Sequence, residues 1–239
     1  MKLDLLAIAA HPDDAELTCG GTLAKMAAAG YQVGILDLTR GEMGTRGTAE
    51  IRAREAAAAA KALGVQHREN LGLADAHLAP SQENKLKLAA RIRALRPHTV
   101  ILPYWEARHP DHYHASHLAY EACFLAGLKQ LQLEGQAFRP FKILYATMYD
   151  ETARPSFVVD ISQQFDRRMR AIRCYQSQFG EKTASRDADV YIPLSDLEER
   201  VTQIVRHYGQ MIGVAYGEPF LVREVMQVDD IVRMPVRSL

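Results

Sequence analysis

The sequence predicts an α/β fold in which a mostly parallel sheet is flanked by helices. Short apolar runs recur along the chain, and each is continuous rather than alternating, as is typical of strands buried on both faces of a parallel sheet. Helical patterns separate the first four runs, which indicates strand–helix–strand connections. The 239 residues, 48% apolar and 24% charged, fit one large domain over residues 1–239, or one domain with a C-terminal extension.

The expected strands are LDLLAIAA, VGILDL, TVILP, KILYATM and SFVVDI, and HREN followed by LGL is a candidate for a further short strand. The expected helices between the first four strands cover residues 16–29, 49–63, 82–95 and 110–129. The alanine-rich segment IRAREAAAAAKALG is a strong helix former that ends at a glycine. From about Phe157 the order changes to a strand and two helices, near 163–175 and 194–212. This order predicts a Rossmann-like arrangement.

The charge balance and the cysteines exclude several classes of protein. With 29 basic and 29 acidic residues, the chain has no general attraction for nucleic acid or for a membrane surface. The stretch DRRMRAIRCY is best explained as a solvated helix face. Three widely spaced cysteines indicate reduced thiols, and no segment has the length of a signal peptide or a membrane span. We therefore expect a cytoplasmic protein with no nucleic-acid or membrane partner.

The stretch AAHPDDAELTCGG places a histidine and three acids directly after the first strand. One interpretation is structural: Asp13 caps the next helix and Glu16 completes a capping box. The other is a metal site, because His11 and Asp14 on a sharp strand-to-helix turn can point at a common centre. The capping interpretation gives His11 no role. Ligands of such sheets bind beyond the carboxyl ends of the strands, where this turn lies.

A second loop, PYWEARHPDHYHASH, follows the strand TVILP in the same way and holds four of the nine histidines. Pro110 suits the first turn of a helix and Asp111 suits its positive end. His112 can then face the first loop, although a polar helix start on the surface is the alternative. His11, Asp14 and His112 would form a His₂Asp set, which suits catalytic Zn²⁺ and also Fe²⁺.

The remaining polar groups of the two loops can supply acid–base chemistry. Asp13 is free to act as a general base on a water beside the metal. A protonated His109 can stabilise an oxyanion, with Asp111 as the partner that holds it charged. We expect His114 and His117 to lie outside this set.

The motifs AHPDDAE…GG, RAREA before LGV, and RHPDH resemble the LmbE-like or PIG-L family of zinc-dependent N-deacetylases. The resemblance runs over nearly the whole chain. FVVDIS, YQSQF and GVAYGEPF make it most similar to the deacetylases of bacillithiol biosynthesis. It implies the LmbE-like fold and these roles: His11, Asp14 and His112 as metal ligands, Asp13 as general base, His109 as the electrophilic histidine with Asp111 beside it, and Arg52 as a substrate-binding residue. Arg108 is a second candidate for binding a carboxylate.

The reaction implied by the resemblance is hydrolysis of an acetamide on glucosamine, with N-acetylglucosaminyl malate as the substrate. Alternatives with the same chemistry are a deacetylase of N-acetylglucosamine or chitooligosaccharides and an amidase of thiol conjugates. A zinc-binding protein without catalysis would leave Asp13 unexplained. The sequence has neither a G-x-G-x-x-G nor a P-loop motif after a strand, and no G-x-S-x-G elbow, which disfavours nucleotide-binding and serine-hydrolase functions.

Three further features have open roles. The glycine-rich segment 39–48, TRGEMGTRGT, is expected to form a mobile loop at the mouth of the pocket. Trp105 is either a face on which a sugar stacks or a packed anchor of its loop. The resemblance also implies a homo-oligomer, with a hexamer as one form.

Overall fold

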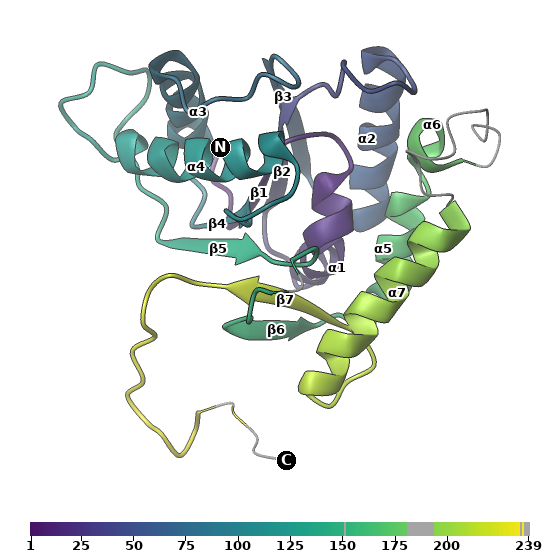
Figure 1. The fold of residues 1–239 in the computed structure, drawn as a ribbon. Helices are drawn as coiled ribbons and strands as arrows, with labels where there is room; N and C mark the ends of the chain where they lie inside the picture. Colours follow the sequence, from purple (N-terminus) through teal and green to yellow (C-terminus); the bar gives the residue numbers. More distant parts are fainter. Residues whose placement is uncertain (151, 181–193, 235, 237–239) are drawn as a thin grey trace.

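The protein is built on one seven-stranded sheet with the order β3-β2-β1-β4-β5-β7-β6 (Figure 1). The computed structural model describes residues 1–150, 152–180, 194–234 and 236. All strands run parallel except β7, which is antiparallel to both of its neighbours. The α/β prediction is therefore confirmed. The strands are β1 (Leu5–Ala9), β2 (Val33–Thr39), β3 (His67–Leu73), β4 (Thr99–Pro103), β5 (Lys142–Ala146), β6 (Phe157–Asp160) and β7 (Gly217–Leu221).

Helices cover both faces of this sheet. They are α1 (Asp14–Ala28), α2 (Ala49–Leu63), α3 (Gln82–Leu95), α4 (Pro110–Ala126), α5 (Phe165–Ile172), α6 (Gln176–Phe179) and α7 (Leu194–Met211). Helices α3 and α4 pack together, and α1, α2 and α5 form a second group (Figure 1). Alternate residues of β1 supply the two cores: Leu6 packs in the core with α3 and α4, whereas Leu5 packs in the core with α1, α2 and α5. Because both faces of the sheet pack against helices, the side chains on both faces of each strand are apolar, and the strands appear in the sequence as continuous apolar runs.

The structure differs from the expected elements mainly in the C-terminal part. The helix expected near 163–175 is the shorter α5, and a separate turn of helix, α6, follows it. Strand β7, sequence GEPFL, was not among the expected strands. It pairs with β5 and β6 and extends the sheet beyond its parallel part. The short strand considered for HREN-LGL is real and forms the β3 edge.

Helix α1 is interrupted at Cys19, where φ is −145°. Glu218 of β7 accepts a hydrogen bond from the backbone N–H of Gly21 at 2.8 Å, which caps the second half of the helix. Arg168 of α5 donates to the carbonyl oxygen of Glu16 at 3.0 Å at the end of the first half, and it pairs with Glu218 at 3.3 Å. These buried charges satisfy the backbone groups that the break leaves open. They fix the first turn of α1 against the interior.

The sheet order places a topological switch point between β1 and β4. The chain proceeds from β1 to β2 and β3 on one side, and it then returns to β4 on the other side of β1. In such sheets the loops after the two strands beside the switch point border the crevice in which ligands bind. These are the two histidine-containing loops of the sequence. Among the described residues, no helix is both long and apolar enough to cross a membrane.

Candidate metal centre

The turn after β1 takes its shape from an unusual backbone conformation at Asp13. Its φ is 112°, a region that residues with a side chain rarely adopt and that costs of order 1–3 kcal/mol. The predicted cap is wrong: Asp13 makes no side-chain cap, and its Oδ2 instead accepts from Arg52 Nη2 at 3.1 Å. Glu16 does not complete a capping box either, because its buried carboxylate contacts Arg68 and Tyr175. The strain turns the carboxylate of Asp13 away from the helix.

His11, Asp14 and His112 come together at the switch point. Their candidate ligand atoms all lie within 4.8 Å of one another. His11 Nδ1 is 3.3 Å from Asp14 Oδ2, and His112 Nε2 is 3.1 Å from Asp14 Oδ1. Atoms bound about 2.0–2.1 Å from a tetrahedral Zn²⁺ are roughly 3.3 Å apart. The three side chains therefore fit one metal ion and leave a fourth position open.

The charges of His11, Asp14 and His112, called the trio below, depend on each other. Burial alone would lower the pKa of His11, but hydrogen bonds to Asp14 and Asp75 raise it to about 11. Burial alone would raise the pKa of Asp14, but the charge of His112 and hydrogen bonds from both histidines hold it well below its ordinary range. Without a metal, protons on the histidines thus balance the carboxylate. A divalent cation can take the place of those protons.

Asp111 and Asp75 hold the far side of the His11 ring. Asp111 Oδ2 lies 3.3 Å from His11 Nε2, and Asp75 Oδ1 lies 3.1 Å from the same nitrogen. The Asp111 carboxylate thus forms its hydrogen bond with His11, while its candidate ligand atom also lies within 4.8 Å of one of His109, so its role as the partner of a charged His109 stays a prediction. Asp75 was not singled out in the sequence. It is a lone acid two residues beyond β3, and its position at the carboxyl end of a strand was the only sequence signal that it belongs to the site.

His109 is the N-cap of α4, and its ring stacks on that of His112 with a centroid separation of 4.8 Å. Its Nδ1 accepts from the backbone N–H of Asp111 at 3.2 Å. Burial, followed by the charges of His112 and His11, lowers the pKa of His109 below its ordinary value. In the metal-free protein these charges oppose a proton on His109, and its protonated form in the reaction stays a prediction. With Nδ1 as an acceptor, the neutral tautomer carries its proton on Nε2.

Arg52 of α2 contacts Asp13 rather than an open surface. Its guanidinium also donates to the carbonyl oxygens of Pro12 at 2.6 Å and Gly41 at 3.2 Å, and its side chain is 6% exposed. Gly41 has φ 67°, and a Cβ there would lie 1.9 Å from Arg52 Nη1. Only glycine allows this approach. Burial raises the pKa of Asp13 to about 7, and the charge of Arg52 opposes that rise. The role of Arg52 in substrate binding stays a prediction.

The 39–48 loop is tied to the site at several points. The backbone N–H of Met43 donates to Asp75 Oδ2 at 2.8 Å, and Glu42 Oε1 accepts from the N–H of Asp75 at 3.0 Å. Farther along, Gln178 of α6 donates to the carbonyl oxygen of Arg46 at 2.8 Å. The loop expected at the pocket mouth is therefore anchored next to His11 in this structure.

The remaining residues singled out in the sequence lie outside the trio. Trp105 is half-buried and packs edge-on against Tyr145 at 4.7 Å, with the guanidinium of Arg223 4.3 Å from its ring centroid. These contacts favour its role as a loop anchor. Arg108 is exposed on the same loop. His114 and His117 both pack against Tyr113 and do not belong to the trio.

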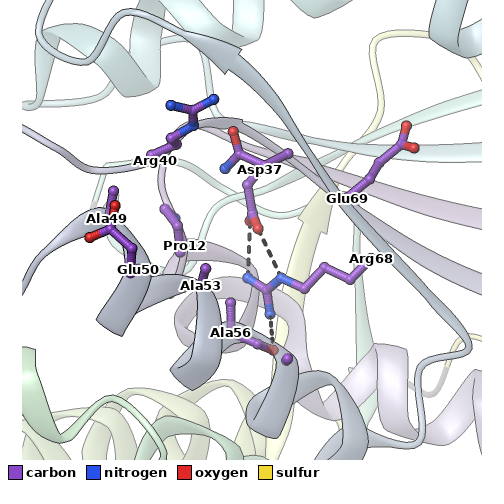
Figure 2. Close-up of a pocket in the computed structure, with 11 residues that line it drawn as sticks. Pro12, Asp37, Arg40, Ala49, Glu50, Ala53, Ala56, Arg68 and Glu69 are labelled. Carbon is purple, nitrogen blue, oxygen red and sulfur yellow. Dashed lines mark hydrogen bonds and ion pairs between the residues drawn. The ribbon is translucent and has the colours of Figure 1, made fainter.

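A cavity of about 370 Å³ lies between α2 and the ends of β2 and β3, bordered by Pro12 (Figure 2). Two of its polar groups are paired: Arg68 donates two hydrogen bonds to Asp37, of 2.8 and 3.0 Å, and it also donates to the carbonyl oxygen of Ala56 at 3.1 Å (Figure 2). The helix wall consists largely of alanines. In the part of the chain that the structure describes, the convergent histidines and acids lie at the trio, not in this cavity.

Comparisons with known proteins bear on the family and on the fold. The model of the GlcNAc-PI de-N-acetylase family, PIG-L, matches residues 6–123, a span that holds both loops. The diacetylchitobiose deacetylase of Thermococcus kodakarensis is 33% identical over 226 residues, which cover 90% of this chain and 80% of that protein. The conserved protein TT1542 from Thermus thermophilus superposes with a TM-score of 0.84 at 44% identity over 95% of this chain and 98% of that one. The N,N′-diacetylchitobiose deacetylase from Pyrococcus horikoshii gives 0.78 at 29% identity, over 92% and 82%.

Proposed function

Since the chain belongs to the PIG-L family, whose model is that of a GlcNAc-PI de-N-acetylase, we propose that it is a metal-dependent hydrolase that removes the acetyl group from an N-acetylated amino sugar. One observation carries the proposal. Asp13, whose backbone is strained at φ 112°, directly precedes Asp14, a member of the trio that fits a metal ion, and its buried carboxylate contacts Arg52 of α2 instead of capping its own helix. A site that only stored a metal would have no use for that strain.

His11, Asp14 and His112 would hold the ion, which we propose to be Zn²⁺, with Fe²⁺ as the alternative for the same ligands. When bound, such an ion polarises the amide carbonyl and lowers the pKa of a nearby water from about 15.7 toward 7. Asp13 would accept the proton of the attacking water. It would later return that proton to the departing amine. Arg52 orients the carboxylate of Asp13 and opposes its protonation in the resting protein.

His109 would donate a hydrogen bond to the oxyanion of the tetrahedral intermediate. Its Nδ1 is occupied by the N–H of Asp111, so the proton of its neutral ring is on Nε2. A neutral donor suffices for this role, because oxyanion stabilisation requires an oriented N–H rather than a full charge. The stacking on His112 supports this assignment, since it holds the His109 ring next to a residue that would bind the ion.

Two observations favour different substrates within this class. The motifs of the C-terminal part favour N-acetylglucosaminyl malate, with Arg108 as the group that pairs with a malate carboxylate. The 33% identity to a diacetylchitobiose deacetylase favours a chitooligosaccharide or N-acetylglucosamine instead. Amidase action on a thiol conjugate is the third candidate. A cytoplasmic location and a homo-oligomer, such as a hexamer, stay predictions.

The test is acetate release from N-acetylglucosaminyl malate, diacetylchitobiose and N-acetylglucosamine, measured side by side with zinc-loaded and chelator-treated protein. Metal-dependent release that strongly favours the malate glycoside supports that substrate. Preference for diacetylchitobiose supports the second candidate and removes the first. Stoichiometric metal binding with no acetate from any acetamide sugar refutes the deacetylase proposal.

A further inference from the structure

We propose that Asp75 is a positioning residue for the metal ligand His11 and that it couples the 39–48 loop to metal binding. The inference rests on the proposed function, because it requires His11 to bind the metal through Nδ1. Asp75 is 6% exposed and lies in the loop after β3, outside the loops that supply the trio. It does not touch the position that a substrate would occupy through any contact described above. Its effect would pass through His11.

The two nitrogens of His11 face opposite partners. Nδ1 lies 3.3 Å from Asp14, whereas Nε2 lies 3.1 Å from Asp75 Oδ1. A metal on Nδ1 requires that nitrogen to be unprotonated, so the proton of the neutral ring sits on Nε2. That proton can be donated to the carboxylate of Asp75. Such a carboxylate fixes the tautomer and the ring orientation, and it makes the coordinating nitrogen a stronger donor.

Asp111 Oδ2 forms a hydrogen bond with Nε2 at 3.3 Å, and Asp75 Oδ1 lies at ion-pair distance from the same nitrogen, so the two carboxylates share a single N–H. The backbone N–H of Ala76 lies between the carboxylates, 2.9 Å from Asp75 Oδ1 and 2.8 Å from Asp111 Oδ2. Ala76 adopts φ 61°, a conformation that costs of order 1–3 kcal/mol for a residue with a side chain. This strained turn holds both acids at the ring. Both carboxylates therefore position the ring, and Asp75 is the one that also contacts the 39–48 loop.

Asp75 differs from Asp111 in its connection to the loop after β2. Its Oδ2 accepts from the N–H of Met43, and its own N–H donates to Glu42. One side chain therefore joins the loops after β1, β2 and β3. When His11 is held by a metal, the carboxylate of Asp75 is held as well, and the 39–48 loop gains a fixed anchor. Loss of this carboxylate should weaken metal binding even though no ligand is removed.

The experiment compares Asp75→Asn with Asp111→Asn and with the control Asp4→Asn, which changes a surface carboxylate that accepts a hydrogen bond from the backbone N–H of Gln32. The Zn²⁺ dissociation constant of each metal-free protein is measured by competition with a chromophoric chelator, in the absence of any substrate. We expect D75N to bind zinc about 10–100-fold more weakly than the wild type. We expect D111N to weaken zinc binding as well, because Asp111 shares the same N–H, and D4N to stay within about twofold of the wild type.

A second measurement needs no variant and so does not depend on D75N folding. In the zinc-loaded wild type, ¹⁵N NMR of the histidines should show Nδ1 of His11 on the metal and Nε2 protonated. Zinc on Nε2 would overturn the proposal, as would a dissociation constant of folded D75N within twofold of that of the wild type. Tight zinc binding without deacetylase activity would refute the proposed reaction and leave the role of Asp75 intact. A wild type that binds no zinc would refute both.

Discussion

Asp13→Asn separates catalysis from metal binding and from folding at this site. Asparagine tolerates the positive φ of 112° better than most residues, so the turn is retained. Its amide oxygen can still accept from Arg52, whose guanidinium also keeps the carbonyl oxygens of Pro12 and Gly41. The variant therefore leaves the trio in place and removes one thing, a carboxylate that can take a proton.

The expected loss follows from that single change. A positioned general base contributes about 10²–10⁴-fold to a rate. At about 1.36 kcal/mol per tenfold, this is roughly 2.7–5.4 kcal/mol of transition-state stabilisation. Folding stability should fall by less, about 1–3 kcal/mol, because Arg52 loses a charged partner but no hydrogen-bond acceptor. Zinc affinity should change little, since Asp13 is not a member of the trio.

The assay is kcat for acetate release with zinc in excess, together with the zinc dissociation constant and urea unfolding of the same preparation. Asp4→Asn is the matched control: the Asp4 carboxylate also accepts a backbone hydrogen bond, from Gln32 at 2.8 Å, but on the surface. It should leave kcat unchanged. A D13N protein that is folded, holds zinc and keeps kcat within tenfold of the wild type would remove Asp13 from the mechanism.

Three further outcomes follow from the described contacts. Gly41→Ala should destabilise the protein in urea unfolding by at least about 1–3 kcal/mol, because a Cβ at φ 67° would lie 1.9 Å from Arg52 Nη1; an unchanged midpoint would contradict that contact. Arg168→Leu should lower the free energy of unfolding by about 3–5 kcal/mol, because it leaves the buried charge of Glu218 without an ion-pair partner. Arg173→Leu, which breaks an exposed ion pair, should lower it by at most about 1 kcal/mol, and equal losses in the two variants would refute the role of burial. Chelation should abolish acetate release. Relative to protein with zinc at 100 times its dissociation constant, it should also lower the free energy of unfolding by about 2.7 kcal/mol and Tm by roughly 5–11 °C, as measured by scanning calorimetry. An unchanged Tm would show that the folded state does not hold the metal.

Much of the fold was predictable because each parallel strand carries its own signal. Residues 5–9 and 99–103 are apolar on both faces, and that property depends on the sequence alone. Strand β7 was not predictable in this way, since GEPFL contains a proline and a buried glutamate. Glu218 is tolerated there because it caps the broken helix α1 and pairs with Arg168. Those partners lie far away in the sequence, so no local pattern indicates the strand.

The candidate site shows the same division. His11, Asp14 and His112 were predicted from two loops that follow neighbouring parallel strands, and the structure brings them together. The direction of the Asp111 carboxylate was not predictable, because spacing along a helix start does not say which of two nearby rings an acid faces. Asp75 follows the edge strand β3, two strands away from β1, and reaches His11 only through a left-handed turn.

The charge of the site gives an independent reason to expect a cation there. Three carboxylates, of Asp14, Asp75 and Asp111, lie within 3.3 Å of the His11 ring, and a fourth, that of Asp13, is buried against the guanidinium of Arg52. Uncompensated buried charge is costly, and burial near like charges normally forces a group to neutralise. Here the metal-free protein compensates by holding protons on His11, whose pKa is raised to about 11 by Asp14 and Asp75 against its burial. A divalent ion supplies the same charge as protons on His11 and His112 and leaves both rings free to act as ligands, so the metal can replace the protons without a change in the charge balance.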